Sequence, residues 1–197
     1  MTEIEPGRFE VVALAASAGG LAALSTVLRA LPADLPAALL IVQHLDREHR
    51  SLMAEILDRR SALRVEEAKT GAALHFGVAY VAPPDQHLLV NPDARIVLTH
   101  TELVHFVRPS ADLLFESVAG SYGRNAIAVV LTGTGADGSL GVQAIKKTGG
   151  TVIVQDEASS EFFGMPGAAI DTGCTDFVVS LADIGPLVVR LVMGGCP

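Results

Sequence analysis

The chain has 197 residues, 50% of them hydrophobic, which is enough to bury one substantial core and matches the length of a single domain. The formal net charge of −8 and the lack of any Lys/Arg-rich stretch argue against a nucleic acid or an anionic membrane as partner. Two cysteines, Cys174 and Cys196, without metal-site spacing indicate a reduced, cytoplasmic setting.

The first uncharged stretch predicts a strand, a tight turn and a helix. The strand is expected over about 9–16, the turn carries Ser17, and leucines at helical spacing follow from Leu21 to Leu31. Gly19-Gly20 interrupts the run and the preceding flank is acidic, so neither a signal peptide nor membrane insertion is expected.

Ser17 is the first candidate for chemistry. A serine between a strand end and a helix start lies beside N–H groups that the helix does not use, a geometry suited to a nucleophile with an oxyanion hole. Ala18 and Gly19 would supply those backbone donors. An ordinary strand-to-helix turn is the alternative at this point.

A second apolar run, 37–42, has the length of a buried strand and ends in Gln43-His44. His44 is therefore expected just beyond the carboxyl end of a strand. A helix over 51–60 and a short strand over 63–67 are expected to follow.

The middle of the chain changes to β-rich runs separated by turn residues. Between Gly77 and Thr99 the turn chemistry of Pro83-Pro84-Asp85 and Asn91-Pro92-Asp93 predicts an antiparallel hairpin. Ser110 is then the expected N-cap of a helix that runs to about residue 122.

The last third alternates strands and helices again. A buried strand over 126–131 leads into a glycine-rich loop that contains Thr134 and Asp137. The remaining elements are expected in this order: a helix to 147, a strand over 151–155, a loop over 157–166, a short helix over 168–171, a strand over 177–179 and a helix over 181–193.

This order predicts an α/β fold: a doubly wound, mostly parallel sheet with an antiparallel hairpin, in three α/β/α layers. Ligands of such sheets bind beyond the carboxyl ends of the strands, where Ser17, His44 and Asp137 are expected. Together they supply a Ser-His-Asp triad of nucleophile, base and orienting acid. Their chain order differs from that of α/β-hydrolases.

The glycine-rich loop also has a rival interpretation. Gly133, Gly135 and Gly138 spell G-x-G-x-x-G, the dinucleotide-binding fingerprint, and Asp156 follows Gly133 by 23 residues, where a ribose-binding acid would be expected. Against this stands Asp137, because a carboxylate inside the loop would repel a pyrophosphate. The residues alone favour a hydrolase and leave a dinucleotide-binding protein as the alternative.

The other histidines have no spacing that suggests a metal site, so surface or loop roles are expected for them. They are His49, His75, His87, His100 and His105. No metal and no cofactor is expected. Met165, in Phe163-Gly164-Met165-Pro166, is expected to shape the crevice.

Five separated motifs resemble the catalytic domain of the chemotaxis protein-glutamate methylesterase family, over about residues 9–193. They are Ala16-Ser17-Ala18-Gly19-Gly20, Val42-Gln43-His44, Tyr80-Val81-Ala82-Pro83-Pro84, Leu131-Thr132-Gly133-Thr134-Gly135-Ala136-Asp137-Gly138 and Phe163-Gly164-Met165-Pro166. The resemblance implies a cytoplasmic enzyme that hydrolyses glutamyl γ-methyl esters on chemoreceptor helices and can deamidate glutamines. It matches Ser17, His44 and Asp137 to the nucleophile, the base and the orienting acid.

The resemblance also sets the expected domain organisation. We expect a short tail over 1–8 and a single methylesterase catalytic domain over 9–197, without the receiver domain usual in the family. Three alternatives for its regulation follow: constitutive activity, control by a separate regulatory partner, or adaptation to another substrate. Ala18 stands where many members have threonine, and Thr134 where some have methionine. A non-catalytic docking module of the same fold remains the alternative.

Overall fold

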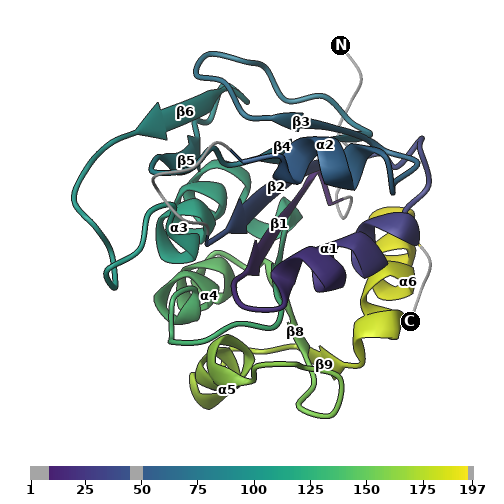
Figure 1. Cartoon of the computed structure of the whole chain (residues 1–197), viewed down its shortest axis with the longest axis vertical. Helices are drawn as coiled ribbons and strands as arrows, with labels where there is room; N and C mark the ends of the chain where they lie inside the picture. Colours follow the sequence, from purple (N-terminus) through teal and green to yellow (C-terminus); the bar gives the residue numbers. More distant parts are fainter. Residues whose placement is uncertain (1–8, 45–50, 195–197) are drawn as a thin grey trace.

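The computed structural model describes residues 9–44 and 51–194, and the tail expected over 1–8 lies outside them. Within these ranges a sheet of seven parallel strands has the order β3-β4-β2-β1-β7-β8-β9 (Figure 1). The strands are β1 (Val11–Ala16), β2 (Ala38–Gln43), β3 (Arg64–Glu67), β4 (Val78–Val81), β7 (Ala126–Val130), β8 (Thr151–Gln155) and β9 (Phe177–Val179).

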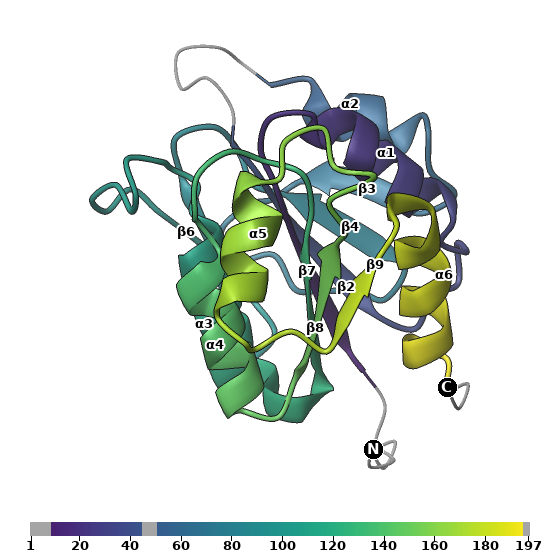
Figure 2. The ribbon, with the colours of Figure 1, turned by 90° about the horizontal axis from the view of Figure 1, so that it is seen from below.

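Helices cover both faces of this sheet. Figure 2 shows α1, α2 and α6 on one face and α3, α4 and α5 on the other, so the predicted three-layer α/β/α arrangement is confirmed. The helices are α1 (Gly20–Arg29), α2 (Met53–Asp58), α3 (Ala111–Tyr122), α4 (Ser139–Lys147), α5 (Gly164–Asp171) and α6 (Leu181–Val192), and a short 3-10 helix spans Gly123–Asn125.

The predicted hairpin is present as β5 (His87–Val90) and β6 (Ile96–Thr99), which pair antiparallel in a sheet of their own. The β-rich run before it is not part of the hairpin. That run is β4, which pairs in parallel with both β2 and β3 and so belongs to the main sheet.

The helix expected over 168–171 begins earlier, at Gly164. Pro166, the last residue of the expected loop, lies inside the helix instead, because a proline in the first turn is tolerated where its missing N–H is not needed. Phe163 is therefore the N-cap of α5, and Met165 lies in the first turn of the helix and is 1% exposed.

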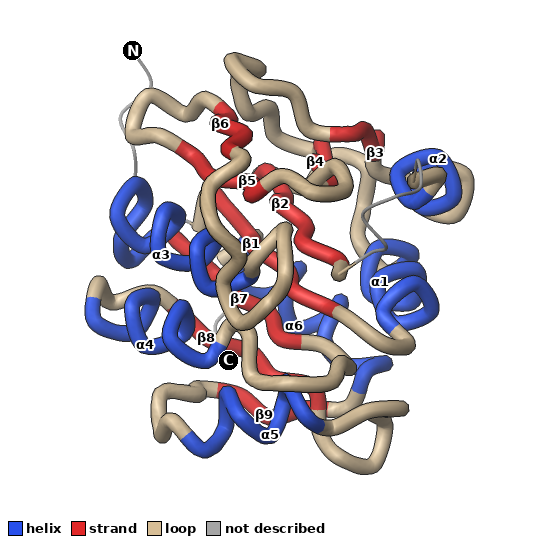
Figure 3. Tube along the Cα trace, turned by 60° about the vertical axis from the view of Figure 1, so that its left-hand side comes forward, coloured by secondary structure: helices blue, strands red, loops and turns tan. Residues whose placement is uncertain are grey.

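Strand β1 lies at the centre of the sheet and shows why the molecule has two apolar layers. Successive side chains of a strand point to opposite faces. Val11, Ala13 and Ala15 belong to the cluster on the α3 side, whereas Val12 and Leu14 belong to the cluster under α1 and α6. Figure 3 shows the strands between α3 and α4 on one side and α1 and α2 on the other.

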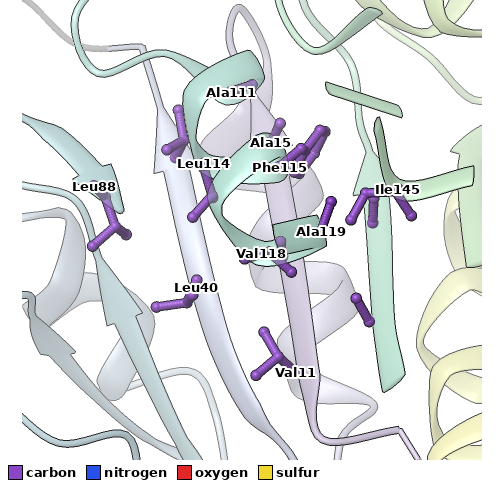
Figure 4. Close-up of a cluster of buried hydrophobic side chains, with 14 of the residues drawn as sticks. Val11, Ala15, Leu40, Leu88, Ala111, Leu114, Phe115, Val118, Ala119 and Ile145 are labelled. Atoms are coloured by element: carbon purple, nitrogen blue, oxygen red, sulfur yellow. The ribbon is translucent and has the colours of Figure 1, made fainter. Parts of the chain in front are cut away.

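Helix α3 packs closely on the centre of the sheet. Figure 4 shows Leu114, Phe115 and Val118 pointing from α3 towards the strands that carry Ala15 and Leu40. Small side chains on β1 allow this approach. The hairpin covers the outer side of the same cluster through Leu88, Val90 and Ile96.

The parallel arrangement brings the carboxyl ends of β1, β2 and β7 to one edge of the sheet. The registers Ala16 with Gln43 and Ala15 with Val130 place the residues that follow these strands side by side. In the part of the chain that the structure describes, no helix is both long enough and apolar enough to cross a membrane.

We predict that Phe115→Ala lowers the free energy of unfolding by about 3–5 kcal/mol, because Phe115 is completely buried and the substitution leaves a cavity between α3 and the sheet. Urea unfolding followed by circular dichroism measures this. The control is Leu140→Ala, since Leu140 is 52% exposed and its truncation should change stability by less than about 0.5 kcal/mol. Equal losses in the two variants would contradict the packing described here.

Candidate active site

Ser17 occupies the turn between β1 and α1. Its backbone N–H donates to the carbonyl oxygen of Thr132 over 3.0 Å, and its own carbonyl oxygen accepts from the N–H of Gly20 over 2.9 Å. Gly19, the N-cap of α1, has a φ of 77°, a conformation that glycine adopts without a Cβ penalty. The expected strand–turn–helix is therefore present, with Ser17 at its corner.

The side chain of Gln43 joins the backbones on either side of the site. Its Nε2 donates to the carbonyl oxygen of Ser17 over 2.7 Å and to that of His44 over 3.0 Å. Gln43 is 5% exposed, and its Oε1 lies so close to Gly20 that a Cβ there would be 1.9 Å away. No pattern in the sequence indicates this role of Gln43; its position directly before His44 is the only signal for it.

His44 lies just after β2, as predicted, and it contacts Asp137. Its Nε2 is 2.8 Å from Oδ2 of Asp137, and the two side chains are 12% and 3% exposed. A carboxylate only accepts, so Nε2–H is the donor and Nδ1 is the nitrogen left without a proton in the neutral ring. Nδ1 is therefore the atom that can act as a base.

Asp137 is held by the first residues of α3. Its Oδ2 accepts from the N–H of Ala111 over 2.6 Å, and its Oδ1 accepts from the N–H of Asp112 over 3.1 Å and from the Ser110 hydroxyl over 2.8 Å. The positive end of a helix dipole and these donors favour a carboxylate. Ser110 is the N-cap that was predicted, but its bond to Asp137 was not.

This environment decides the charge of Asp137. Burial alone would raise its pKa, but the hydrogen bonds from His44, Ala111 and Asp112 outweigh burial and hold the pKa below the ordinary value of 3.8. Asp137 is thus an anion at neutral pH. It can fix the tautomer of His44 and stabilise an imidazolium.

Ser17, His44 and Asp137 all line one cavity of about 280 Å³. The other residues that line it are His105, Val107, Thr134, Gly135 and Ala136. The Ser17 hydroxyl donates no hydrogen bond to any described residue, so it is available to a bound molecule. Ser17 also lines a neighbouring, more open groove of about 500 Å³ between α1 and α2, where Leu21, Met53 and Arg60 lie.

Backbone N–H groups near Ser17 are available as donors. Those of Ala18, Gly19 and Thr134 make no hydrogen bond to any residue that the structure describes. The Ala18 carbonyl oxygen accepts from the Thr132 hydroxyl over 3.1 Å, which ties this turn to the loop after β7. Only Thr134 of the three also lines the cavity.

The glycine-rich loop packs closely against Ser17, and this close packing explains its first glycine without a bound phosphate. A Cβ on Gly133 would lie 2.4 Å from Sδ of Met165 and 2.8 Å from Cβ of Ser17, so only glycine fits there. Met165 and Ser17 therefore both pack against Gly133, but Met165 is 1% exposed and does not line the cavity, so its expected role in shaping the crevice stays a prediction. Asp156 accepts from the backbone N–H and the hydroxyl of Ser159 instead of facing this loop. The dinucleotide interpretation has no support from this arrangement.

A second serine and a second histidine, Ser110 and His87, form a hydrogen-bonded network with the same Asp137. The Ser110 hydroxyl donates to Asp137, and the Ser110 N–H donates to Nδ1 of His87 over 3.1 Å. Ser110 and His87 are both completely buried, and burial lowers the pKa of His87. A buried hydroxyl that already donates to a carboxylate is no nucleophile, so this network holds the start of α3.

The surface or loop positions predicted for the other histidines agree with the structure for some of them and not for others. The surface or loop role expected for His87 is wrong, because its buried ring bridges the Ser110 N–H and the carbonyl oxygen of Glu102. His75 and His100 are exposed, as expected, whereas His49 lies outside the described residues. His105 lies on the cavity wall, a position that no spacing in the sequence indicated.

Comparison with known proteins identifies the family. The model of the CheB methylesterase family matches residues 12–188. The chain belongs to this family. Its fold matches the crystal structure of the Thermotoga maritima CheB methylesterase catalytic domain with a TM-score of 0.90 and 34% sequence identity, over 93% of this chain and 99% of that one.

Two curated relatives place the chain within the CheB family. A protein-glutamate methylesterase/protein-glutamine glutaminase of Moorella thermoacetica is 45% identical over 96% of this chain, which spans 46% of that protein. A putative enzyme of the same name from Leptospira interrogans is 37% identical, over 93% of this chain and 95% of its own length. The chain therefore spans about half of the longer relative and nearly all of the shorter one.

We predict that Asp137→Asn lowers the free energy of unfolding at neutral pH and that the difference from the wild type shrinks as pH falls. A carboxyl whose pKa is depressed on folding contributes stability above 3.8, and this contribution is lost as pH falls through the lower pKa of the folded state. Urea unfolding between pH 7 and pH 3 measures it. Asp34→Asn, at an exposed position, is the control; a difference independent of pH would contradict the prediction.

Proposed function

We propose that the chain hydrolyses γ-methyl esters of glutamyl residues on the cytoplasmic helices of chemoreceptors, with Ser17 as nucleophile, His44 as base and Asp137 as orienting acid. The hydrogen bond from His44 to the anionic Asp137, in the cavity that Ser17 lines, carries this proposal. The names of the relatives supply glutamate and glutamine residues of proteins as the class of substrate, and the resemblance to chemotaxis methylesterases supplies the chemoreceptor. The domain over 9–197 would contain the whole catalytic machinery.

The reaction would begin with transfer of the Ser17 proton to Nδ1 of His44. The Ser17 oxygen attacks the ester carbonyl carbon, and Asp137 stabilises the imidazolium that forms. Negative charge develops on the carbonyl oxygen, where backbone N–H groups of Ala18, Gly19 or Thr134 would donate. Loss of one such donor typically lowers turnover by about 10²–10³-fold.

The second half of the reaction reverses these proton transfers. The methoxide leaving group takes the proton from His44 and departs as methanol, leaving an acyl ester on Ser17. Water then loses a proton to His44 and attacks this ester, which frees the glutamyl carboxylate and returns the proton to Ser17. With a glutamine side chain the same steps would release ammonia, so deamidation needs no additional residue.

The space around Ser17 suits a substrate carried on a protein. The cavity with His44 and His105 is small, whereas the groove beside α1 and α2 is open and partly apolar, with Leu21 and Met53 in its wall. A side chain can therefore enter the cavity while the polypeptide that carries it stays at the surface. This arrangement supports a protein substrate.

We predict that Ser17→Ala abolishes methanol release from a methylated receptor fragment while the protein remains folded, because the nucleophile is removed and Ser17 donates no side-chain hydrogen bond within the described residues. Methanol is measured by gas chromatography and folding by circular dichroism. Ser121→Ala, at the other end of α3, is the control and should keep the wild-type rate. Undiminished release by Ser17→Ala would overturn the proposed function.

We predict that Gln43→Leu lowers kcat roughly ten- to a hundredfold and changes KM less than about threefold. The substitution removes the donor shared by the carbonyl oxygens of Ser17 and His44, so nucleophile and base lose their fixed separation. Steady-state methanol release measures both constants. Gln143→Leu, on the exposed side of α4, is the matched control and should be neutral; an unchanged kcat in Gln43→Leu would assign Gln43 to stability alone.

A further inference from the structure

An unusual turn at 104–107 borders the active-site cavity. Val104 and Val107 exchange two backbone hydrogen bonds, of 3.2 and 2.9 Å, and the two residues between them are His105 and Phe106. Both have positive φ, 49° and 65°. A two-residue hairpin turn of this kind normally uses Asn, Asp or Gly, so histidine and phenylalanine are strained here.

The strained turn holds the His105 ring in a defined place. Nε2 of His105 is 3.0 Å from Oδ2 of Asp112, and Asp112 is 2% exposed. Oδ1 of Asp112 accepts from the N–H of Gly141 over 2.7 Å, so α4 fixes the carboxylate from the other side. The backbone N–H of Asp112 donates to Asp137, which means that one residue holds both His105 and the orienting acid.

The position of the ring points to a contact with substrate. His105 lines the same cavity as Ser17, His44 and Thr134, and its side chain is 43% exposed. Because Nε2 is occupied by Asp112, the nitrogen left for a bound molecule is Nδ1. Backbone strain is often found at functional sites, and here it accompanies a second imidazole in the cavity that Ser17 and His44 line.

We propose that His105 is a substrate-positioning residue, whose Nδ1 forms a hydrogen bond with a polar group of the peptide that carries the methyl ester, outside the ester itself. This role rests on the function proposed above. Such a bond forms equally in the ground state and the transition state, so it strengthens binding without changing the chemical step. His105 therefore governs KM rather than kcat.

The same protein offers a matched pair for comparison. His100 also forms a hydrogen bond with an aspartate, from Nε2 to Oδ2 of Asp85 over 2.8 Å, and its side chain is 64% exposed. It does not line the cavity that holds Ser17. His100→Ala therefore measures the effect on catalysis of losing a His–Asp hydrogen bond away from the cavity, and the split between KM and kcat in His105→Ala separates substrate positioning from loop anchoring.

The test is steady-state methanol release from a methylated receptor fragment by the purified chain. We expect His105→Ala to raise KM about tenfold and to change kcat less than about threefold, because one hydrogen bond to substrate is lost. His105→Asn keeps hydrogen-bonding atoms and adopts positive φ more readily, so it should recover part of the loss. His100→Ala should have the KM of the wild type.

The outcomes separate this role from the proposed function. Methanol release by the wild type with an unchanged KM in His105→Ala, or an equal rise in His100→Ala, would overturn the role of His105 alone. No release by the wild type would refute the proposed function and this role with it. If His105→Ala does not fold by circular dichroism, His105→Gly, which also lacks the imidazole and adopts positive φ without strain, replaces it with the same expected rise in KM.

Discussion

The N-terminus of α3 is the constraint on which the site depends. A buried carboxylate is unfavourable unless it is paired and hydrogen-bonded, and Asp137 meets this condition through the N–H groups of Ala111 and Asp112, the Ser110 hydroxyl and His44. The position of these donors follows from the packing of α3 on β1, where Phe115, Ala13 and Ala15 belong to one buried cluster. The packing of α3 on the core therefore fixes Asp137, and Asp137 in turn orients the proposed base His44.

The β5–β6 hairpin also helps to fix the N-terminus of α3. Its His87 is completely buried and bridges the N–H of Ser110 and the carbonyl oxygen of Glu102. Because burial lowers the pKa of His87, the ring stays neutral and presents one donor and one acceptor. It thereby satisfies an N–H at the start of α3 that the helix itself cannot use. The hairpin thus fixes the start of the helix that holds Asp137.

The sequence was most informative where local pattern and topology coincide. Ser17, His44 and Asp137 could be placed together because each follows a buried run, and parallel strands bring such ends to one edge. The roles of Gln43 and His105 depend on segments that are distant in the chain, which local patterns do not reveal. Gln43 binds the carbonyl oxygen of Ser17, 26 residues away, and His105 shares a cavity with Ser17 and His44. The prediction for His87 was wrong because a short β-rich run does not show which of its two faces other elements will bury. The run over 78–81 was grouped with the hairpin since only strand pairing distinguishes the two sheets.

The orientation of His44 explains why Gln43 matters to the site. With Nε2 directed to Asp137, the nitrogen available to Ser17 is Nδ1, which is the ring nitrogen nearer the backbone. Fewer rotatable bonds then separate the proposed base from the main chain, so its position follows the backbone of residue 44 closely. Gln43 holds this backbone and that of Ser17 through one amide group. The proposed nucleophile and base are thus positioned in part by hydrogen bonds from the Gln43 side chain to main-chain carbonyls at two adjacent strand ends, and the register of β1 with β2 becomes a determinant of the geometry of the proposed catalytic site.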